Sequence, residues 1–207
     1  MRSSATKTRV RKKPEDRRLE ILDTASQLAL SLGLEKVTMK LVAEQLEVRP
    51  GLISHYFRTI DELICAAFEQ AATGEREGLF AAEEQAQPLD AIRSFLGRVT
   101  APEFSDLGKL WLDARHQSRY RPMLREVVAT QEELTFRRLA EVIAQAVERR
   151  ELHGIDPQLA ATEILVVVDG TASYVNTSAP ESGIALAEVI WRMSEQALGL
   201  PSGALHQ

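Results

Sequence analysis

The chain has 207 residues, 44% of them hydrophobic and 27% charged, which is enough to bury a sizeable core in one or two domains. Its single cysteine, Cys65, excludes a disulfide within the chain and is typical of the reducing cytoplasm. No apolar run approaches the roughly 18 residues of a membrane span, and the basic N-terminus lacks the apolar stretch of a secretion signal. We therefore expect a cytoplasmic protein that has no membrane contact.

Charge is distributed unevenly along the chain. The net charge is −5, but residues 1–58 hold 12 Lys and Arg against 7 Asp and Glu, whereas residues 59–207 hold 13 against 23. A basic head on an acidic body is expected when only one end of a protein meets nucleic-acid phosphates. The alternative interpretation is a basic tail that is solvated and has no partner.

The first part of the chain divides into an arm and a helix. Residues 1–13 are polar and basic without apolar periodicity, so we expect a disordered arm that follows DNA phosphates or enters the minor groove. A helix is predicted from Pro14 to Ser31, because Pro14 suits a helix start and Gly33 suits a helix end.

Residues 38–57, TMKLVAEQLEVRPGLISHYF, predict two short helices joined by a tight turn. Apolar residues at helical spacing give the first helix one buried face: Met39, Val42, Ala43 and Leu46. Thr38 suits the N-cap of that helix, and Pro50 suits the first position of the second one. In the second helix, Ile53 and Phe57 are expected to face the core, and most other residues are expected to be exposed to solvent. This pattern indicates a helix-turn-helix whose second helix enters the DNA major groove.

The sequence GLISHYF at Gly51–Phe57, followed by Thr59 to Leu63, resembles the DNA-binding domain of tetracycline-repressor-type (TetR-family) regulators. The resemblance covers roughly residues 17–66. It implies an all-α protein with a three-helix DNA-binding domain and a helical domain for effector binding and dimerisation. The sequence from Trp111 to Val128, together with GLISHYF, is similar to the choline/betaine-responsive branch of this family.

Three positions depart from the family pattern. Glu47 replaces the usual turn glycine, and a non-glycine residue with left-handed backbone costs roughly 1–2 kcal/mol. Arg49 replaces a capping Ser or Thr, so we expect it to contact phosphate or a base instead. Ile60 replaces a frequent Lys, which removes one usual phosphate contact.

The resemblance and the expected exposed face together assign the DNA contacts. The residues expected to face bases or the groove wall are Arg49, Gly51, Leu52, Ser54 and His55, on a helix opened by Pro50. The residues expected to hold phosphates are Thr38, Tyr56, Arg58 and those of the basic arm.

The rest of the chain predicts further helices and no strand. Thr59 and Glu62 form a capping box that starts a helix running toward about Ala86. We interpret this helix as a lever between head and body, with a passive spacer as the alternative. Further helices are predicted over about 89–99, 105–118, 122–150, 157–176 and 182–199, the last one capped by Ser182. The fold class is all-α with about nine helices, divided into an arm (1–13), a DNA-binding domain (14–60) and an effector and dimerisation domain (61–207).

The last two helices are apolar on most sides and must bury more than one face. We predict that they pair with a second copy of the chain in a four-helix bundle, through Ile164, Val168, Leu186, Ile190, Trp191 and Met193. The alternative is a central core helix. A homodimer would present two reading heads to a palindromic operator.

Motifs for catalysis or resident cofactors are not found in the sequence. It lacks GxGxxG, P-loop, HExxH, CxxC and GxSxG patterns, so we expect neither an enzyme nor a cofactor nor a metal. Asp113 and His116 have the spacing of two ligands on one helix, but a hydrogen-bonded structural pair is the preferred interpretation.

An effector pocket is better supported. Asp169 lies in an apolar helical run, where a carboxylate is costly unless it is paired or hydrated, and Gly170 opens space beside it. Residues predicted to line the pocket are Phe95, Trp111, His116, Tyr120, Phe136, Asp169 and Tyr174. A carboxylate with aromatic faces suits a small polar or cationic effector. The alternative is that Asp169 pairs with an arginine across the dimer.

The sequence thus predicts a repressor that a small molecule releases from DNA. Two rivals remain: a DNA-binding module that is controlled by a protein partner or unregulated, and an all-α enzyme that uses the body pocket.

Overall fold

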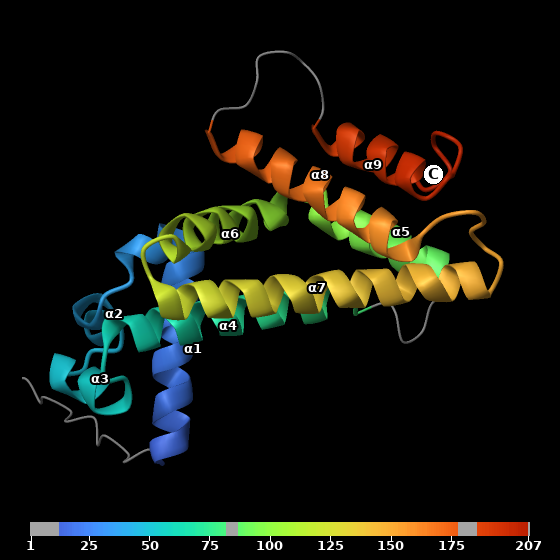
Figure 1. The fold of residues 1–207 in the computed structure, drawn as a ribbon. Coiled ribbons are helices and arrows are strands. Elements are labelled where there is room, and N and C mark those ends of the chain that lie inside the picture. The colour runs from blue at the N-terminus through green and yellow to red at the C-terminus, as the bar shows by residue number, and fades with distance from the viewer. Residues whose placement is uncertain (1–12, 82–86, 178–185, 207) are drawn as a thin grey trace, which may run out of the picture.

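The computed structural model describes residues 13–81, 87–177 and 186–206, and every regular element in these ranges is a helix (Figure 1). The elements are α1 (Pro14–Leu32), η1 (Leu34–Lys36), α2 (Met39–Gln45), α3 (Pro50–Tyr56), α4 (Ile60–Leu79), α5 (Pro88–Val99), η2 (Pro102–Phe104), α6 (Ser105–Ser118), α7 (Pro122–Glu148), α8 (Pro157–Thr177) and α9 (Leu186–Ala197). The predicted all-α class is confirmed. None of the described helices combines the length and the hydropathy that a membrane span requires.

Local signals set most helix starts. Proline is the first residue of α1, α3, α5, α7 and α8, a position where its missing N–H leaves no helical hydrogen bond unmade. Thr38 and Thr59 cap α2 and α4, because their hydroxyl oxygens accept hydrogen bonds from Leu41 N (3.0 Å) and Glu62 N (3.1 Å). These starts agree with the sequence-based predictions within a residue.

Helix α4 is shorter than predicted, since it ends at Leu79 rather than near Ala86. The next residue, Phe80, turns into the core and stacks on Phe95 of α5, with 5.3 Å between ring centroids. The predicted cap Ser182 and arm residues 1–12 lie outside the described residues.

The head of the molecule is built from α1, α2, α3 and the N-terminal half of α4 (Figure 1). Phe57 is buried there, as predicted, and so is Leu63. The same hydrophobic cluster extends to Leu110 and Trp111 of α6 and to Leu124 of α7. Helix α6 is therefore packed against the head and is not confined to the body.

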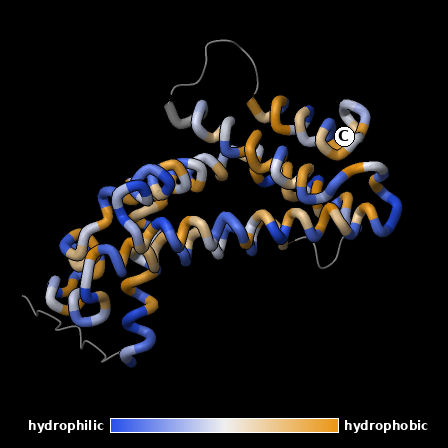
Figure 2. The backbone as a smooth tube through the Cα atoms, in the orientation of Figure 1, coloured by the Kyte–Doolittle hydropathy of each residue, from blue (hydrophilic) through white to orange (hydrophobic). Residues whose placement is uncertain are grey.

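A second core joins α5, α7, α8 and α9, along which hydrophobic and hydrophilic residues alternate (Figure 2). The C-terminal segment folds back over α9. The buried carboxylate of Glu195 accepts hydrogen bonds from Gly203 N and Leu205 N, both at 2.8 Å, and the ring of His206 stacks on Trp191 at 4.8 Å. One apolar side of α9 is thus covered by the chain itself.

This packing corrects the predicted dimer interface. Ile164 is fully buried within the subunit, and Val168, Ile190 and Trp191 are at most 7% exposed. These four side chains pack within the subunit and leave almost no surface for another copy. Met193 is exposed and Leu186 is partly buried, which leaves both available to a partner.

Candidate nucleic-acid interface and ligand pocket

The turn between α2 and α3 has the strained backbone that the sequence predicts. Glu47 has a positive φ of 53°, and Val48 N closes the turn on Ala43 O at 2.9 Å. Arg49 occupies the N-cap of α3 without a side-chain capping bond, as expected. Its guanidinium group is therefore not used to cap the helix.

Helix α3 is anchored to the head by one fully buried side chain, Ile53. Gly51, Ser54 and His55 are exposed on its outer side, together with Pro50 at its start, whereas Leu52 and Tyr56 are half-buried. A Cβ atom at Gly51 would meet no atom within 4 Å, so the fold of the chain does not require glycine there. A glycine on an exposed face permits close approach of another molecule's backbone.

Cationic side chains flank this face. Arg49 precedes α3 and Arg58 follows it, and both are exposed, as is Thr38 at the start of α2. The backbone N–H of Arg58 donates to Glu62 Oε2 at 2.7 Å, which fixes the chain direction there. The His55 ring packs edge-on against Tyr56, with centroids 5.2 Å apart.

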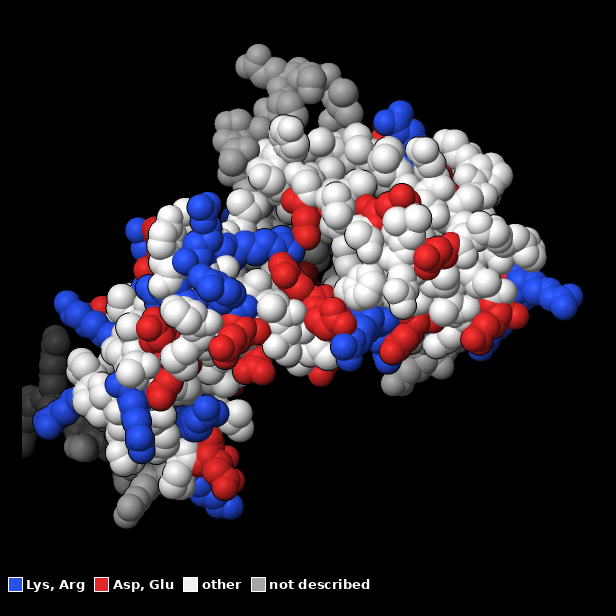
Figure 3. All heavy atoms as spheres, viewed as in Figure 1, with Lys and Arg blue, Asp and Glu red and all other residues white. Residues whose placement is uncertain are grey.

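The body contains a cavity of about 440 Å³ between α4, α5, α6, α7 and α8. Its aromatic and aliphatic lining includes Leu79, Phe95, Val99, Phe104, Trp111, Leu112, Phe136, Leu165, Val166 and Val168. Its charged lining consists of Glu75, Arg115, Glu132, Glu133 and Asp169. Figure 3 shows acidic side chains gathered around a hollow in the middle of the molecule.

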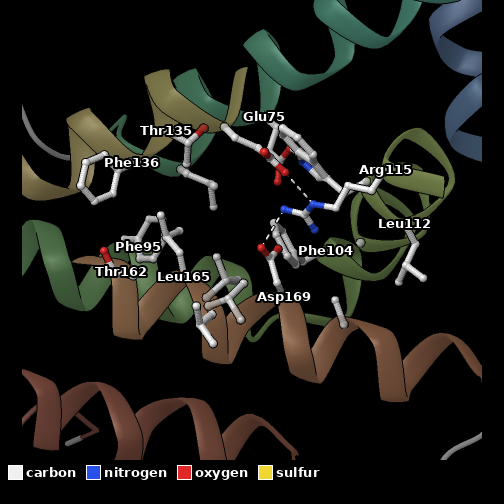
Figure 4. A pocket seen from close by; sticks show the side chains of 18 of the residues that line it. Glu75, Phe95, Phe104, Leu112, Arg115, Thr135, Phe136, Thr162, Leu165 and Asp169 are labelled. Atoms are coloured by element: carbon white, nitrogen blue, oxygen red, sulfur yellow. Dashed lines mark hydrogen bonds and ion pairs between the residues drawn. The ribbon is translucent and has the colours of Figure 1, made fainter. Parts of the chain in front are cut away.

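A chain of polar contacts crosses this cavity (Figure 4). Trp111 Nε1 donates to Glu75 Oε2 at 2.6 Å. Arg115 donates from Nε to Glu132 Oε1 and from a terminal nitrogen to Asp169 Oδ2, both at 2.7 Å. The same guanidinium lies over the Trp111 ring, 5.2 Å from its centroid. Four helices are thereby connected through side chains inside the pocket.

Burial favours the neutral form of two of these carboxyl groups. The pKa of Glu75 is raised to about 7, chiefly because burial removes water from the carboxylate and secondarily because Asp169 lies nearby, although the Trp111 hydrogen bond opposes the shift. Burial also raises the pKa of Asp169, and the attraction of Arg115 only partly offsets this. A cation that entered the cavity would favour the charged form of both groups.

The structure brings four of the seven predicted pocket residues together. Phe95, Trp111, Phe136 and Asp169 line the cavity. The other three do not: His116, Tyr120 and Tyr174 are exposed outside it, Tyr120 by 73% and Tyr174 by 62%. His116 and Tyr174 lie on helices that line the pocket but on other sides of them, and Tyr120 lies in the turn between α6 and α7.

Sequence reasoning missed Glu75, Phe104, Arg115 and Glu132. Arg115 follows Trp111 by four residues on α6, a spacing that places both on one helical face, so it could have been found. The alternative for Asp169 was an ion pair with an arginine across the dimer. Asp169 does pair with an arginine, Arg115, but within the subunit.

Asp113 has a different role from the one expected. It does not pair with His116; its Oδ2 accepts a hydrogen bond from Leu34 N of η1 at 3.0 Å. Gly33 makes room for this contact, because a Cβ atom there would lie 2.9 Å from the same oxygen. Helix α6 therefore carries both pocket residues and a direct bond to the head. Among the described residues, no three His, Cys, Asp or Glu side chains converge as metal ligands.

Two family models match the chain. Residues 21–67 match bacterial regulatory proteins of the tetR family, and residues 88–192 match the C-terminal domain of BetI-type transcriptional repressors.

Curated relatives agree with these matches. The HTH-type transcriptional regulator BetI of Burkholderia thailandensis is 31% identical over 121 residues, which cover 55% of this chain and 60% of the relative. The regulator BetI of Cronobacter sakazakii is 27% identical over 162 residues, covering 74% of this chain and 76% of the relative. The chain thus spans less than two thirds of the Burkholderia relative.

Solved structures share the fold. A TetR-family transcriptional regulator from Rhodococcus sp. has a TM-score of 0.71 at 22% identity and covers 85% of this chain and 95% of its own. A transcriptional regulator from Saccharomonospora viridis in complex with choline has a TM-score of 0.69 at 18% identity and covers 87% and 95%. The matched domains, in the order and arrangement described above, make this chain a member of the TetR family of bacterial transcriptional regulators, with a C-terminal domain of the BetI repressor type.

Proposed function

We propose that this protein represses transcription as a homodimer on a palindromic operator, and that a small organic cation bound in the body cavity releases it. The observation that carries the proposal is the outer side of α3. Gly51, Ser54 and His55 are exposed there and take no part in the core. A two-turn helix is stable only when it is docked, so residues on its free side are available for recognition.

The proposed DNA contacts follow from position on the head. Arg49, Gly51, Leu52, Ser54 and His55 would meet bases or the groove wall. Thr38, Tyr56 and Arg58, together with the basic arm, would hold phosphates through charge and hydrogen bonds. Because phosphate contacts release counterions, binding should weaken steeply as salt is raised.

The outer side of α8 supports the proposed dimer. Leu159 is 57% exposed and Val166, which also lines the cavity, is 64% exposed, although both are large apolar residues. Gly170 lies one turn further on, and a Cβ atom there would meet nothing within 4 Å. A stripe of apolar and small residues lets two helices approach closely. We therefore propose this side of α8, with Met193 of α9, as the interface with a second copy.

A cationic effector is favoured by the pocket lining. Four carboxylates and four aromatic rings face a cavity large enough for a small metabolite. Carboxylates attract a cation, and aromatic faces stabilise an alkylated ammonium group that cannot donate hydrogen bonds. The Saccharomonospora viridis regulator of the same fold was solved in complex with choline, which supports this class of ligand for the present chain.

Selection of bound sites from random duplex DNA tests the DNA-binding half of the proposal. Tyr56→Phe should weaken binding about five-fold on every selected site, because one phosphate hydrogen bond of about 1 kcal/mol is lost. His55→Ala should instead relax the preference at one base pair, by about 1–3 kcal/mol. Reversed effects of the two variants, or the absence of any enriched sequence, would contradict the assignment.

Titration of the selected complex with choline and with tetramethylammonium tests the effector half. We expect release from DNA at concentrations that do not release it when sodium chloride of equal ionic strength is added. A protein controlled only by a protein partner needs no internal cavity, so the observed one supports the sensor over that rival. If no organic cation binds or releases the protein, the effector class is wrong while the DNA-binding role stands.

A further inference from the structure

A cation of the chain itself already occupies the pocket. The guanidinium of Arg115 lies between Glu132 of α7 and Asp169 of α8, donating to each carboxylate at 2.7 Å, and it faces the Trp111 ring (Figure 4). Two carboxylates and an indole face are the partners expected for an organic cation. The groups best suited to bind the effector are therefore engaged by an arginine.

The ion pairs of Arg115 with Glu132 and Asp169 contribute little to the folding stability of the protein. The side chains of Arg115, Glu132 and Asp169 are 36%, 43% and 45% exposed, so water reaches all three, although the pocket wall excludes enough of it from Asp169 to raise the pKa of that carboxyl group. Ion pairs at such exposure contribute little to folding, because solvent screens the attraction and two long side chains lose freedom. An exchange of the guanidinium for another cation would leave both carboxylates paired.

We propose that Arg115 is a built-in competitor of the effector: its guanidinium fills the cation subsite of the empty protein and leaves when the effector's cationic group binds between Glu132, Asp169 and Trp111. This inference rests on the proposed cationic effector. It makes Arg115 a determinant of affinity, since the apparent binding constant is reduced by the fraction of molecules in which the subsite is filled.

The exchange also reaches the head. Arg115 ties α6 to α7 and α8, while Asp113, two residues earlier on the same helix, holds Leu34 N. Loss of the two ion pairs frees α6 from the far wall of the pocket but leaves its contact with the head. Effector binding thus changes the restraint on the helix that positions η1 and the following reading helices.

Calorimetric titration of the full-length protein with tetramethylammonium tests the proposal. Arg115→Ala should bind the probe about five-fold or more tightly than wild type, because the competing ion pairs are removed. The same variant without probe should bind the selected operator more weakly, because α6 is already released. Lys109→Ala is the matched control: Lys109 pairs with Asp106 on the exposed side of α6 and neither residue lines the cavity, so this change removes equal charge without emptying the subsite.

Each outcome decides the matter. Tighter binding by Arg115→Ala but not by Lys109→Ala supports the competitor, whereas equal tightening in both variants means a general field effect and overturns it. Unchanged or weaker binding by Arg115→Ala, with wild type binding normally, also overturns it and leaves the cationic effector intact. If neither wild type nor variant binds the probe, the proposed effector class fails as well. Should Arg115→Ala not fold, Arg115→Lys decides: a single ammonium bridges two carboxylates less well, so it must bind the probe more tightly than wild type.

Discussion

Because Glu75 is buried in the pocket wall, the folding stability of the protein depends on pH through this single residue. Its pKa of about 7 lies above the ordinary value of 4.5, chiefly because of burial. The charged groups that face it are Asp169 of α8, Arg115 of α6 and Arg76 of its own helix, and the Trp111 indole donates to it. Between about pH 4.5 and 7 the folded protein retains a proton that the unfolded chain has lost. The contribution of Glu75 to stability therefore falls as pH rises through this window.

Glu75→Gln should remove the loss of stability that burial of Glu75 causes as pH rises. The variant keeps an oxygen that can accept the Trp111 hydrogen bond but has no charge to bury. We expect it to be more stable than wild type by about 1–3 kcal/mol at pH 8, and to differ much less at pH 5. Urea denaturation at the two pH values measures this difference. The same change on the exposed side of α4, Glu77→Gln, should follow wild type at both pH values, and a gain of Glu75→Gln that is independent of pH would contradict the stated cause.

At the scale of elements, α6 connects what the sequence separates into head and body. It contributes Trp111 and Arg115 to the pocket, and Asp113 to the bond with Leu34 N. Trp111 also packs edge-on against Phe68 of α4, with ring centroids 5.0 Å apart. The sequence indicated a lever in α4 alone, but in the structure both α4 and α6 connect the pocket to the head, so we expect both to take part in any transmission from the pocket.

The contact between α6 and the head predicts a specific cost for a methyl group at Gly33. Its φ of 94° and ψ of 151° lie in a region that is nearly restricted to glycine, and a Cβ atom would lie 2.9 Å from Asp113 Oδ2. Gly33→Ala should therefore destabilise the protein by about 2–4 kcal/mol through backbone strain and loss of the Leu34 N hydrogen bond. Thermal or urea unfolding measures this.

Gly97→Ala on α5 is the matched control for that substitution. Gly97 is exposed within a helix, and a Cβ atom there would meet nothing within 4 Å. Alanine should stabilise this position by about 0.5–1 kcal/mol, because it restricts the unfolded chain without a clash. Equal effects at the two glycines would contradict the proposed close contact at Gly33.

The helices were predictable because their signals are local. Prolines open five of them, Thr38 and Thr59 cap two more, and Asp156 Oδ1 accepts from Gln158 N at the start of α8, as its DP pair predicts. The exposed side of α3 was predictable for the same reason. In so short a helix, burial of Ile53 decides which residues lie on the opposite side.

Contacts between distant segments were not predictable. Apolar periodicity indicates that Ile190 and Trp191 are buried but not which molecule buries them. Here other segments of the same chain do so, and His206 of the C-terminal segment stacks on Trp191. Likewise Glu75, Arg115, Glu132 and Asp169 come from four helices, and no spacing in the sequence indicates that they meet. The residue types of the pocket could be predicted from the sequence. The contacts between its polar side chains could not, because they depend on how the four helices pack.

At the scale of the whole molecule, the proposed recognition of a palindrome depends on two heads held at a fixed separation. One α3 reads too few base pairs to define a site, whereas two heads about one helical turn of DNA apart, roughly 34–36 Å, read a palindrome. In the structure α8 and α9 lie at the end of the body that is remote from α3 (Figure 1). An interface there would set the separation of the heads through the full length of the body, so a change in the angle of α4 and α6 would alter it.

The exposed apolar side of α8 makes this interface testable. Leu159→Glu should convert the dimer to monomers, because a two-fold interface places the two new carboxylates close together and buries both, and Leu159 does not line the cavity. We expect the dimer dissociation constant to rise about 100-fold or more, as measured by sedimentation or light scattering. Affinity for the palindrome should fall toward the level of non-specific DNA, whereas binding to a single half-site should stay as weak as in wild type.

Leu134→Glu, the same type of change at an exposed apolar residue of α7, should remain dimeric. A Leu159→Glu protein that stays dimeric would place the interface on another surface, and a monomer that still prefers the palindrome would contradict the requirement for two linked heads.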